Sequence, residues 1–202
     1  MPIDRTIELQ LHPQQLRMFF PLLMEGVEVD IETGSSVKQL LIEQFGITAD
    51  YINSRITTLF LNSRAVDNAA TALVLDGASL ALSGAMPGLV GATMRSGGFY
   101  AAMRGAMTHH NDDQIPLAKR GRIKLKLFNL LLEELGPRIL ARGIVLDSER
   151  LQSLLGAQPA DFRPLGLQLD GRQLPIDRLR GELSAHEVGN LVKLKAHFGD
   201  QP

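Results

Sequence analysis

Stretches in which polar and apolar residues alternate recur along the chain and predict β-strands. In residues 6–11, for example, Ile7, Leu9 and Leu11 fall on one face, and polar residues fall on the other. This period of two is typical of a strand with one side in a core and one in solvent. The expected strands lie in residues 6–11, 26–32, 122–128 and 190–198, with turns and further strands in 56–67, 75–84 and 165–175.

The turn residues predict where these strands reverse. Asn62-Ser63 interrupts the strand of residues 56–67, and Asp76-Gly77 precedes a strand that carries Leu80 and Leu82. Asp170-Gly171 lies between alternating leucines, which is the strongest hairpin signal in the chain. Each of these segments is therefore expected to form or begin a hairpin.

A different spacing predicts helices between the strands. Ser36 followed by Gln39 is a capping-box sequence, and the apolar stripe after it ends at Gly46. Residues 129–143 have a helical pattern with an expected break at Gly136-Pro137. A short strand and a helix capped by Asp147 or Ser148 follow, and residues 12–25 are expected to form a short helical excursion.

Three pieces of the first half, in this order, resemble the β-grasp sulfur carriers. They are VEVDIETGSSVKQLL, LFLNSRAVD and LDGASLALSG, and the resemblance covers about residues 6–85. The family includes the small subunit of molybdopterin synthase and the thiamine-pathway sulfur carrier. The resemblance implies a ubiquitin-like β-grasp domain, in which one amphipathic helix covers one face of a small mixed sheet. An unrelated α+β domain with the same element order is the alternative.

The second half repeats this order in a weaker form. Ile7 to Asp30 matches Ile123 to Asp147, and LFLNSRAVD matches LQLDGRQLP. The predicted fold is therefore α+β: a β-grasp domain in residues 1–85, a Gly/Met-rich connector in 86–121, and a second small α+β unit in 122–202. That second unit is either a degenerate β-grasp repeat or a mostly helical appendage with one hairpin.

The resemblance implies one specific chemistry, which requires a free Gly-Gly carboxylate. Sulfur carriers are activated at such an end by an adenylating enzyme, and Gly97-Gly98 is the matching pair here. More than one hundred residues follow Gly98, so the chain as written is not a thiocarboxylate carrier. It would become a sulfur carrier or ubiquitin-like modifier only through processing after Gly98.

The connector that contains this pair has the composition of a packing or contact segment. Small residues allow close approach of a neighbouring backbone, and methionines adapt to irregular partners. It lacks the lysine of a phosphate-binding loop. The candidate partner-binding residues are Met86, Gly88, Gly91, Met94, Arg95, Phe99, Tyr100 and Met103.

A basic segment follows the connector and offers another candidate contact. Lys119, Arg120 and Arg122 are candidate anion- or nucleic-acid-binding residues. Lys124 and Lys126 share the solvent face of the expected strand, and no stacking aromatic is evident nearby. The sequence therefore does not favour nucleic acid as a partner.

Composition narrows the remaining classes of function. The net charge is −1 and there is no cysteine, so neither a global basic field nor a thiolate site is present. His109, His110, Asp112 and Asp113 are adjacent rather than spaced as metal ligands, which favours a polar linker. The residues predict no membrane span, metal, cofactor or catalytic set. We expect a cytoplasmic, non-enzymatic protein-binding or assembly module, and an exposed edge strand would allow homo-oligomers.

Overall fold

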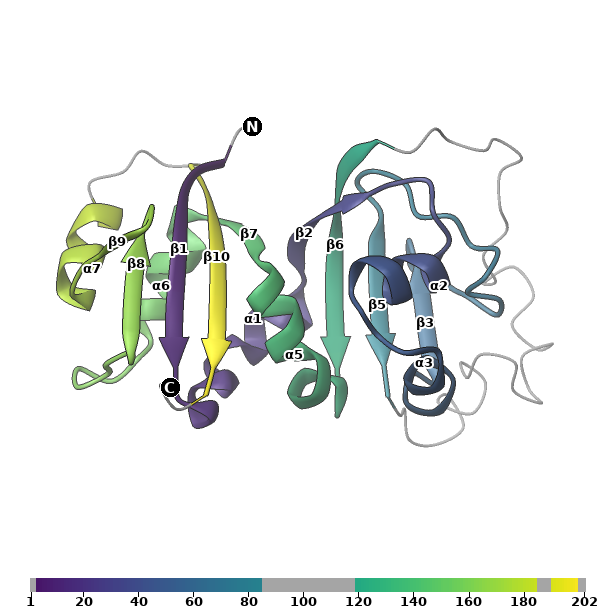
Figure 1. The fold of residues 1–202 in the computed structure, drawn as a ribbon, viewed down its shortest axis with the longest axis horizontal. Helices are drawn as coiled ribbons and strands as arrows, with labels where there is room; N and C mark the ends of the chain where they lie inside the picture. Colours follow the sequence, from purple (N-terminus) through teal and green to yellow (C-terminus); the bar gives the residue numbers. More distant parts are fainter. Residues whose placement is uncertain (1–2, 85–118, 185–189, 200–202) are drawn as a thin grey trace. The chain divides into compact units, whose positions relative to one another are not determined.

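The computed structural model describes residues 3–84, 119–184 and 190–199 and has an α+β fold (Figure 1). Its strands are β1 (Ile3–Leu11), β2 (Val27–Glu32), β3 (Thr58–Leu61), β4 (Arg64–Ala65), β5 (Ser79–Ser83), β6 (Arg120–Phe128), β7 (Ile144–Asp147), β8 (Gly166–Leu169), β9 (Arg172–Gln173) and β10 (Leu191–Phe198). Its helical segments are η1 (Pro13–Phe19), α1 (Phe20–Glu25), α2 (Val37–Gln39), η2 (Leu40–Gln44), α3 (Ala49–Arg55), α5 (Leu131–Arg142), α6 (Ser148–Gly156) and α7 (Ile176–Ser184).

The chain divides into two compact units that do not follow the ranges expected from the sequence. One comprises Leu23–Glu134, and the other combines Met1–Leu22 with Leu135–Pro202. The first expected strand, β1, thus belongs with the C-terminal residues, and β6 belongs with the N-terminal half. Alternation shows which face of a strand is buried, but it carries no information on which strand lies alongside.

The unit of residues 23–134 contains strands in the order β4-β3-β5-β6-β2. β6 lies parallel to β5 and antiparallel to β2. Ile123, Leu125 and Leu127 of β6 are at most 1% exposed, so this strand forms the middle of the core. In Figure 1 helices α2 and α3 lie over one face of strands β3 and β5.

The helix after β2 begins as the capping box predicts. The Ser36 hydroxyl accepts a hydrogen bond from the Gln39 backbone N–H at 3.2 Å, and the Gln39 side chain accepts one from the Ser36 N–H at 3.0 Å. The chain then continues as a π-helical turn through Gln44 and leaves the helix at Gly46, whose φ is +65°. The reciprocal cap satisfies two backbone donors that the first turn would otherwise leave free.

The other unit contains strands in the order β7-β10-β1-β8-β9. β1 lies parallel to β10 and antiparallel to β8, and β10 lies antiparallel to β7. Alternate residues of β1 and β10 are buried, and so are leucines of α6 and α7. Asp147 caps α6, because its side chain accepts from the Arg150 N–H at 2.7 Å.

Two helices were missed by the sequence patterns, and one expected break does not occur. The missed helices are α3 and α7, which have seven and nine residues. Helix α5 continues through Pro137, so the predicted break there is wrong. Proline removes only one backbone donor, and the buried side chains of Leu131, Leu135 and Ile139 on both sides of it keep the helix intact.

The two units match each other strand by strand, but not as the sequence repeat implied. β2 corresponds to β7, and the β3–β4 hairpin corresponds to the β8–β9 hairpin. The place of β6 in one unit, however, is taken in the other by β10, and the place of β5 is taken by β1. The strands in residues 6–11 and 122–128, which the sequence repeat made equivalent, therefore occupy different places in their units.

Candidate functional site: an arginine-lined cleft

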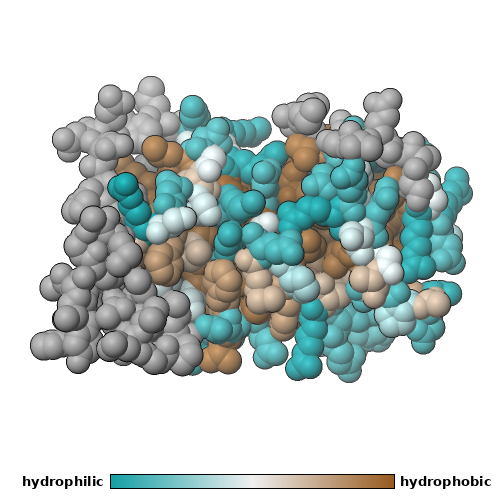
Figure 2. Space-filling view, turned by 180° about the vertical axis from the view of Figure 1, so that it is seen from behind, coloured by the Kyte–Doolittle hydropathy of each residue, from teal (hydrophilic) through white to brown (hydrophobic). Residues whose placement is uncertain are grey.

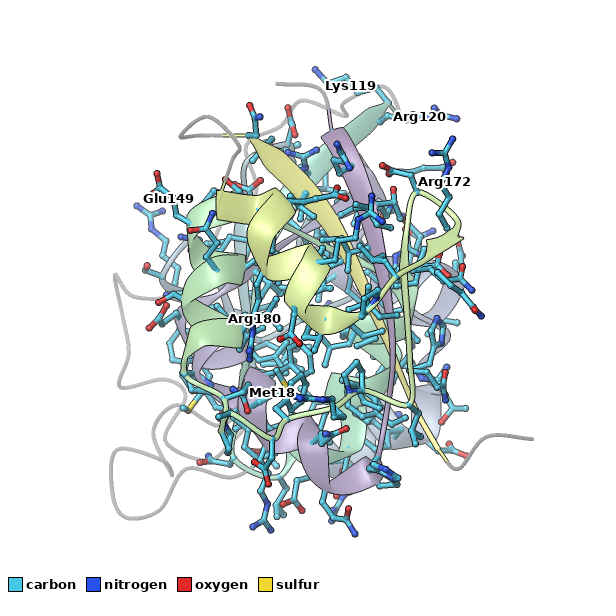
Figure 3. All side chains as sticks on the ribbon, turned by 90° about the vertical axis from the view of Figure 1, so that its left-hand side faces the viewer. Met18, Lys119, Arg120, Glu149, Arg172 and Arg180 are labelled. Atoms are coloured by element: carbon cyan, nitrogen blue, oxygen red, sulfur yellow. The ribbon has the colours of Figure 1, made fainter. Side chains whose placement is uncertain are left out.

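Most of the residues singled out in the sequence lie outside the described ranges. These are the Gly97-Gly98 pair, the four residues His109, His110, Asp112 and Asp113, and the candidate partner-binding residues between Met86 and Met103. Lys119 and Arg120 are described: they are exposed at the start of β6 and extend away from the ribbon in Figure 3.

Arg122, the third residue of the basic segment, is engaged within its own unit. Its guanidinium pairs with Glu28 at 3.2 Å and with Asp30 at 3.0 Å, both on the neighbouring strand β2. Its backbone N–H donates to the Asp76 carboxylate at 2.7 Å. Arg122 therefore joins β6 to β2 and to the loop before β5, and its charge is neutralised locally.

An ion-pair cluster with shifted pKa values joins α3 to the first turns of α5. The Tyr51 hydroxyl donates to Glu134 at 2.5 Å, and the Arg55 Nε donates to the same carboxylate at 3.2 Å. Hydrogen bonds from Arg55 and Tyr51 hold the pKa of Glu134 below its ordinary value of 4.5. Burial, followed by the bond to Glu134, raises the pKa of Tyr51. Tyr51 and Arg55 both donate to Glu134 of the same unit, so the cluster has a structural role in holding α3 to α5. We call these three residues the clasp.

The clasp predicts an acid-dependent stability difference. A carboxyl whose folded pKa is lowered stabilises the fold above its ordinary pKa and loses this contribution as the pH falls below it. We expect Glu134→Gln to lower the melting temperature by a few degrees near pH 7. The difference should begin to shrink as the pH falls below about 4.5, where the unfolded chain takes up the proton, and should be lost once the pH passes the lower folded pKa of Glu134. An equal difference at pH 7 and pH 3, measured by circular dichroism, would contradict this account.

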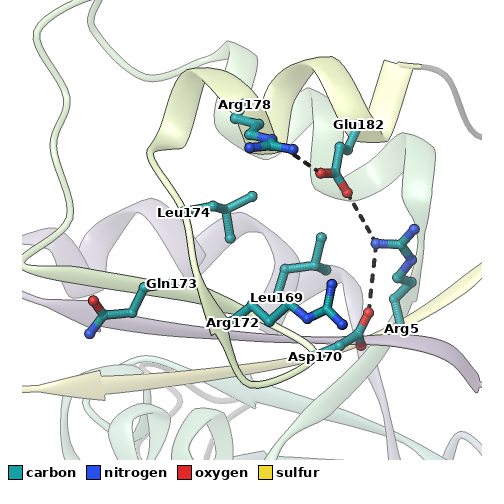
Figure 4. Close-up of a pocket in the computed structure, with 8 residues that line it drawn as sticks. All are labelled: Arg5, Leu169, Asp170, Arg172, Gln173, Leu174, Arg178 and Glu182. Carbon is teal, nitrogen blue, oxygen red and sulfur yellow. Dashed lines mark hydrogen bonds and ion pairs between the residues drawn. The ribbon is translucent and has the colours of Figure 1, made fainter.

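A cavity in the unit of residues 1–22 and 135–202 lies between the β8–β9 hairpin, α7 and the start of β1. Its volume is about 570 Å³ (Figure 4). The charged side chains that line it are Arg5, Asp170, Arg172, Arg178 and Glu182. Leu169 and Leu174 contribute apolar surface beside them. We call this the arginine-lined cleft.

The hairpin that forms one wall of the cleft is locally specified. Asp170 and Gly171 have φ values of +51° and +79°, which two-residue hairpins of the tightest type require. Asp170 also fixes β1 against the turn, because its carboxylate accepts from the Thr6 N–H at 2.9 Å and its own N–H donates to the Thr6 carbonyl at 2.8 Å. This brings Arg5 next to a hairpin more than 160 residues away in sequence.

Four of the five charged groups of the cleft pair with one another. Arg5 contacts Glu182 at 3.1 Å and Asp170 at 3.6 Å, and Arg178 contacts Glu182 at 3.7 Å. In Figure 4 the dashed lines join these four side chains, and none reaches Arg172. Within the described residues, the exposed Arg172 guanidinium has no carboxylate at ion-pair distance. Three arginines against two carboxylates leave one positive charge, at Arg172.

One wall of this cleft is predictable from the sequence, and the others are not. The Asp170-Gly171 signal predicted the hairpin that carries Arg172. Arg5 lies more than 160 residues before the other lining residues in the sequence. Arg178 and Glu182 lie on α7, which was not predicted. The i,i+4 spacing of Arg178 and Glu182 was the only local signal available.

The comparisons with known proteins give no relative. No family model, curated protein or solved structure matches this chain. Within residues 3–84, 119–184 and 190–199, no cluster of histidine and acidic side chains is arranged to hold a metal ion. No helix in the same ranges is long and apolar enough to cross a bilayer.

Proposed function

We propose that the chain is a non-catalytic protein-binding module built on β-grasp-like sheets, and that the arginine-lined cleft holds part of its partner. The observation that carries the proposal is Arg172, which has no carboxylate partner among the described residues and lies in a cleft whose other charges are paired. Such a group is available to a ligand, whereas Arg5 and Arg178 already have acidic neighbours.

The order of the strands supports the scaffold part of the proposal. In residues 23–134, β2 is followed by a capped helix, β3, the short strand β4 and β5, as the resemblance implies for the part after its first strand. The place beside β2 is filled by β6 from later in the chain. In the other unit β7, α6, β8 and the short β9 follow in the same order, and β10 fills the place beside β7.

The chemistry of the cleft supports an acidic segment of a partner protein. One unpaired guanidinium matches one carboxylate, with which it makes two parallel hydrogen bonds in the preferred geometry. Leu169 and Leu174 would contact an apolar side chain next to that carboxylate. The favoured ligand is therefore a short peptide segment in which Asp or Glu neighbours an apolar residue.

The proposal can be tested with a peptide display library screened against the whole chain. We expect enrichment of peptides that combine an acidic residue with an adjacent apolar one. Arg172→Gln should weaken their binding about 10- to 100-fold, because a charge-assisted hydrogen bond is worth about 1.5–3 kcal/mol. The affinities can be measured by fluorescence anisotropy with labelled peptides.

Arg64→Gln is the matched control. Arg64 is exposed and follows the Asn62-Ser63 turn of the β3–β4 hairpin, as Arg172 follows Asp170-Gly171. The Arg64→Gln substitution removes the same charge from the equivalent strand position of the other unit. It should therefore leave the affinity for the selected peptides unchanged. Equal losses in both variants, or selection of peptides without acidic residues, would refute the role of the cleft.

A further inference from the structure

The sheet of residues 23–134 has a second face on which lysines and phenylalanines meet. Residues paired across neighbouring strands share a face. Phe60 pairs with Ala81 and Ala81 with Lys126, so these three form one row across β3, β5 and β6. Phe128 lies on the same face two residues further along β6, and Lys124 lies two residues before Lys126. We call this the Lys–Phe face, defined by Phe60, Ala81, Lys124, Lys126 and Phe128.

The part of this face around Lys124 and Lys126 lies opposite the core of its unit, whereas Thr58 and Ser83, in the row of Phe128, are buried. The leucines between these positions, such as Leu80 and Leu125, are fully buried on the other side, where α2 and α3 lie in Figure 1. Lys124 is exposed, and Lys126, Phe60 and Phe128 are partly exposed. Among the coloured residues in the view from behind, hydrophobic and hydrophilic residues lie next to each other (Figure 2).

The structure thereby changes the interpretation of the lysines. In the sequence, Lys124 and Lys126 had no stacking aromatic evident nearby. The sheet register places Phe60, more than 60 residues away, in the row of Lys126, with only the small side chain of Ala81 between them. Two strand spacings separate Phe60 from Lys126, or about 10 Å. A cation and an aromatic ring therefore lie on one face of the sheet, on either side of a small residue.

We propose that the Lys–Phe face binds single-stranded nucleic acid. Proteins that bind single strands without strong sequence preference combine cations for the phosphates with aromatic rings on which bases stack. Lys124 and Lys126 would contact phosphates, and Phe60 and Phe128 would stack with bases. This surface lies in residues 23–134, whereas the arginine-lined cleft is formed by residues of the other unit, so the two proposals stand or fall separately.

Charge complementarity favours a polyanion at this face. Neither Lys124 nor Lys126 has a carboxylate at ion-pair distance within the described residues. The nearest acidic strand, β2, carries Glu28 and Asp30, and both of these pair with Arg122. The two lysine charges are therefore left for an anionic ligand, although the chain as a whole has a net charge of −1.

The other unit supplies a matched control at the corresponding strand, β10. Lys193 and Lys195 occupy equivalent places there, because each lysine pair packs its side chains against a glycine of positive φ, Gly26 in one unit and Gly143 in the other. Their rows, however, contain Thr6 and Glu8 instead of phenylalanine. Lys195 is also paired with Glu8 at 2.8 Å.

The test uses the full chain and a fluorescein-labelled oligothymidylate of about 20 nucleotides, followed by anisotropy from about 50 mM NaCl upward. We expect saturable binding by the wild type. Lys124→Gln/Lys126→Gln should weaken it about tenfold or more and reduce the slope of log affinity against log salt by about 1.4, because each contact contributes about 0.7 on a single strand. Phe60→Leu, which keeps an apolar side chain, should weaken binding about 5- to 150-fold with the salt slope unchanged.

Lys193→Gln/Lys195→Gln removes the same charge and should change neither affinity nor slope. The melting temperature of each variant shows that it remains folded. The proposal is overturned if the wild type does not bind at about 50 mM NaCl, or if the control variant loses as much affinity as Lys124→Gln/Lys126→Gln. It is also overturned if an oligoglutamate peptide of equal charge displaces the oligonucleotide equally well, because the phenylalanines would then contribute nothing.

Discussion

A fragment of residues 23–134 will fold on its own, and a fragment of residues 1–85 will not. The shorter fragment contains β2 to β5 but lacks β6, which lies between β5 and β2. Ile123, Leu125 and Leu127 of that strand are at most 1% exposed. Losing a buried side chain of this size costs about 2–5 kcal/mol, so three of them remove about 6–15 kcal/mol. This equals the whole stability of a typical domain, about 5–15 kcal/mol.

Urea denaturation followed by circular dichroism distinguishes the two fragments. Residues 23–134 should show a cooperative transition, because the fragment keeps every strand of its unit and the Tyr51–Arg55–Glu134 clasp. Residues 1–85 should show none. Adding Leu125→Ala to the longer fragment provides a graded control, which should lower its stability by about 2–5 kcal/mol. A cooperative transition in residues 1–85 would mean that β6 is dispensable for this core.

The sequence predicted local structure well where one residue type determines the backbone. The Ser36–Gln39 capping box, the Asn62-Ser63 and Asp170-Gly171 turns and the Asp147 cap all occur as expected. In each of them, a side chain or a positive φ acts on residues at most three positions away. Such interactions are visible in a single sequence because they do not depend on the rest of the fold.

The grouping of the strands could not be predicted in the same way. Polar and apolar residues alternate in both β1 and β6, and each strand is followed by helical segments and another strand. Their sequences therefore look equivalent. Their positions differ because one lies between β10 and β8 and the other between β5 and β2. Parallel neighbours such as β1 and β10 are more than 180 residues apart, and no local pattern encodes that separation.

The candidate sites depend on the same long-range placement. Arg172 follows a recognisable turn, but the cleft exists only because Arg5 and α7 meet that hairpin. The Lys–Phe face likewise needs the register of three strands to bring Phe60 into line with Lys126. The individual residues could be singled out from the sequence, whereas the residues that lie next to them in space could not.

Leu9→Ala should destabilise residues far from it in sequence more than residues near it. Leu9 is 1% exposed and lies in β1 between Ala196 of β10 and Leu167 of β8. We expect a loss of about 2–5 kcal/mol, the usual cost of truncating a buried leucine. Because local stability follows the compact unit, amide hydrogen exchange should accelerate most in β8 and β10. Exchange in β2, β3 and β5 should change less.

Leu130→Ala is the control for this experiment, because Leu130 is 53% exposed and its truncation should change stability by less than about 0.5 kcal/mol. Hydrogen exchange read by mass spectrometry gives the comparison peptide by peptide. If residues 1–85 formed a domain of their own, Leu9→Ala would instead expose the amides of β2, β3 and β5 and leave β10 protected. The pattern of exchange therefore decides to which unit the first strand belongs, since β1 shares its hydrogen bonds with β8 and β10.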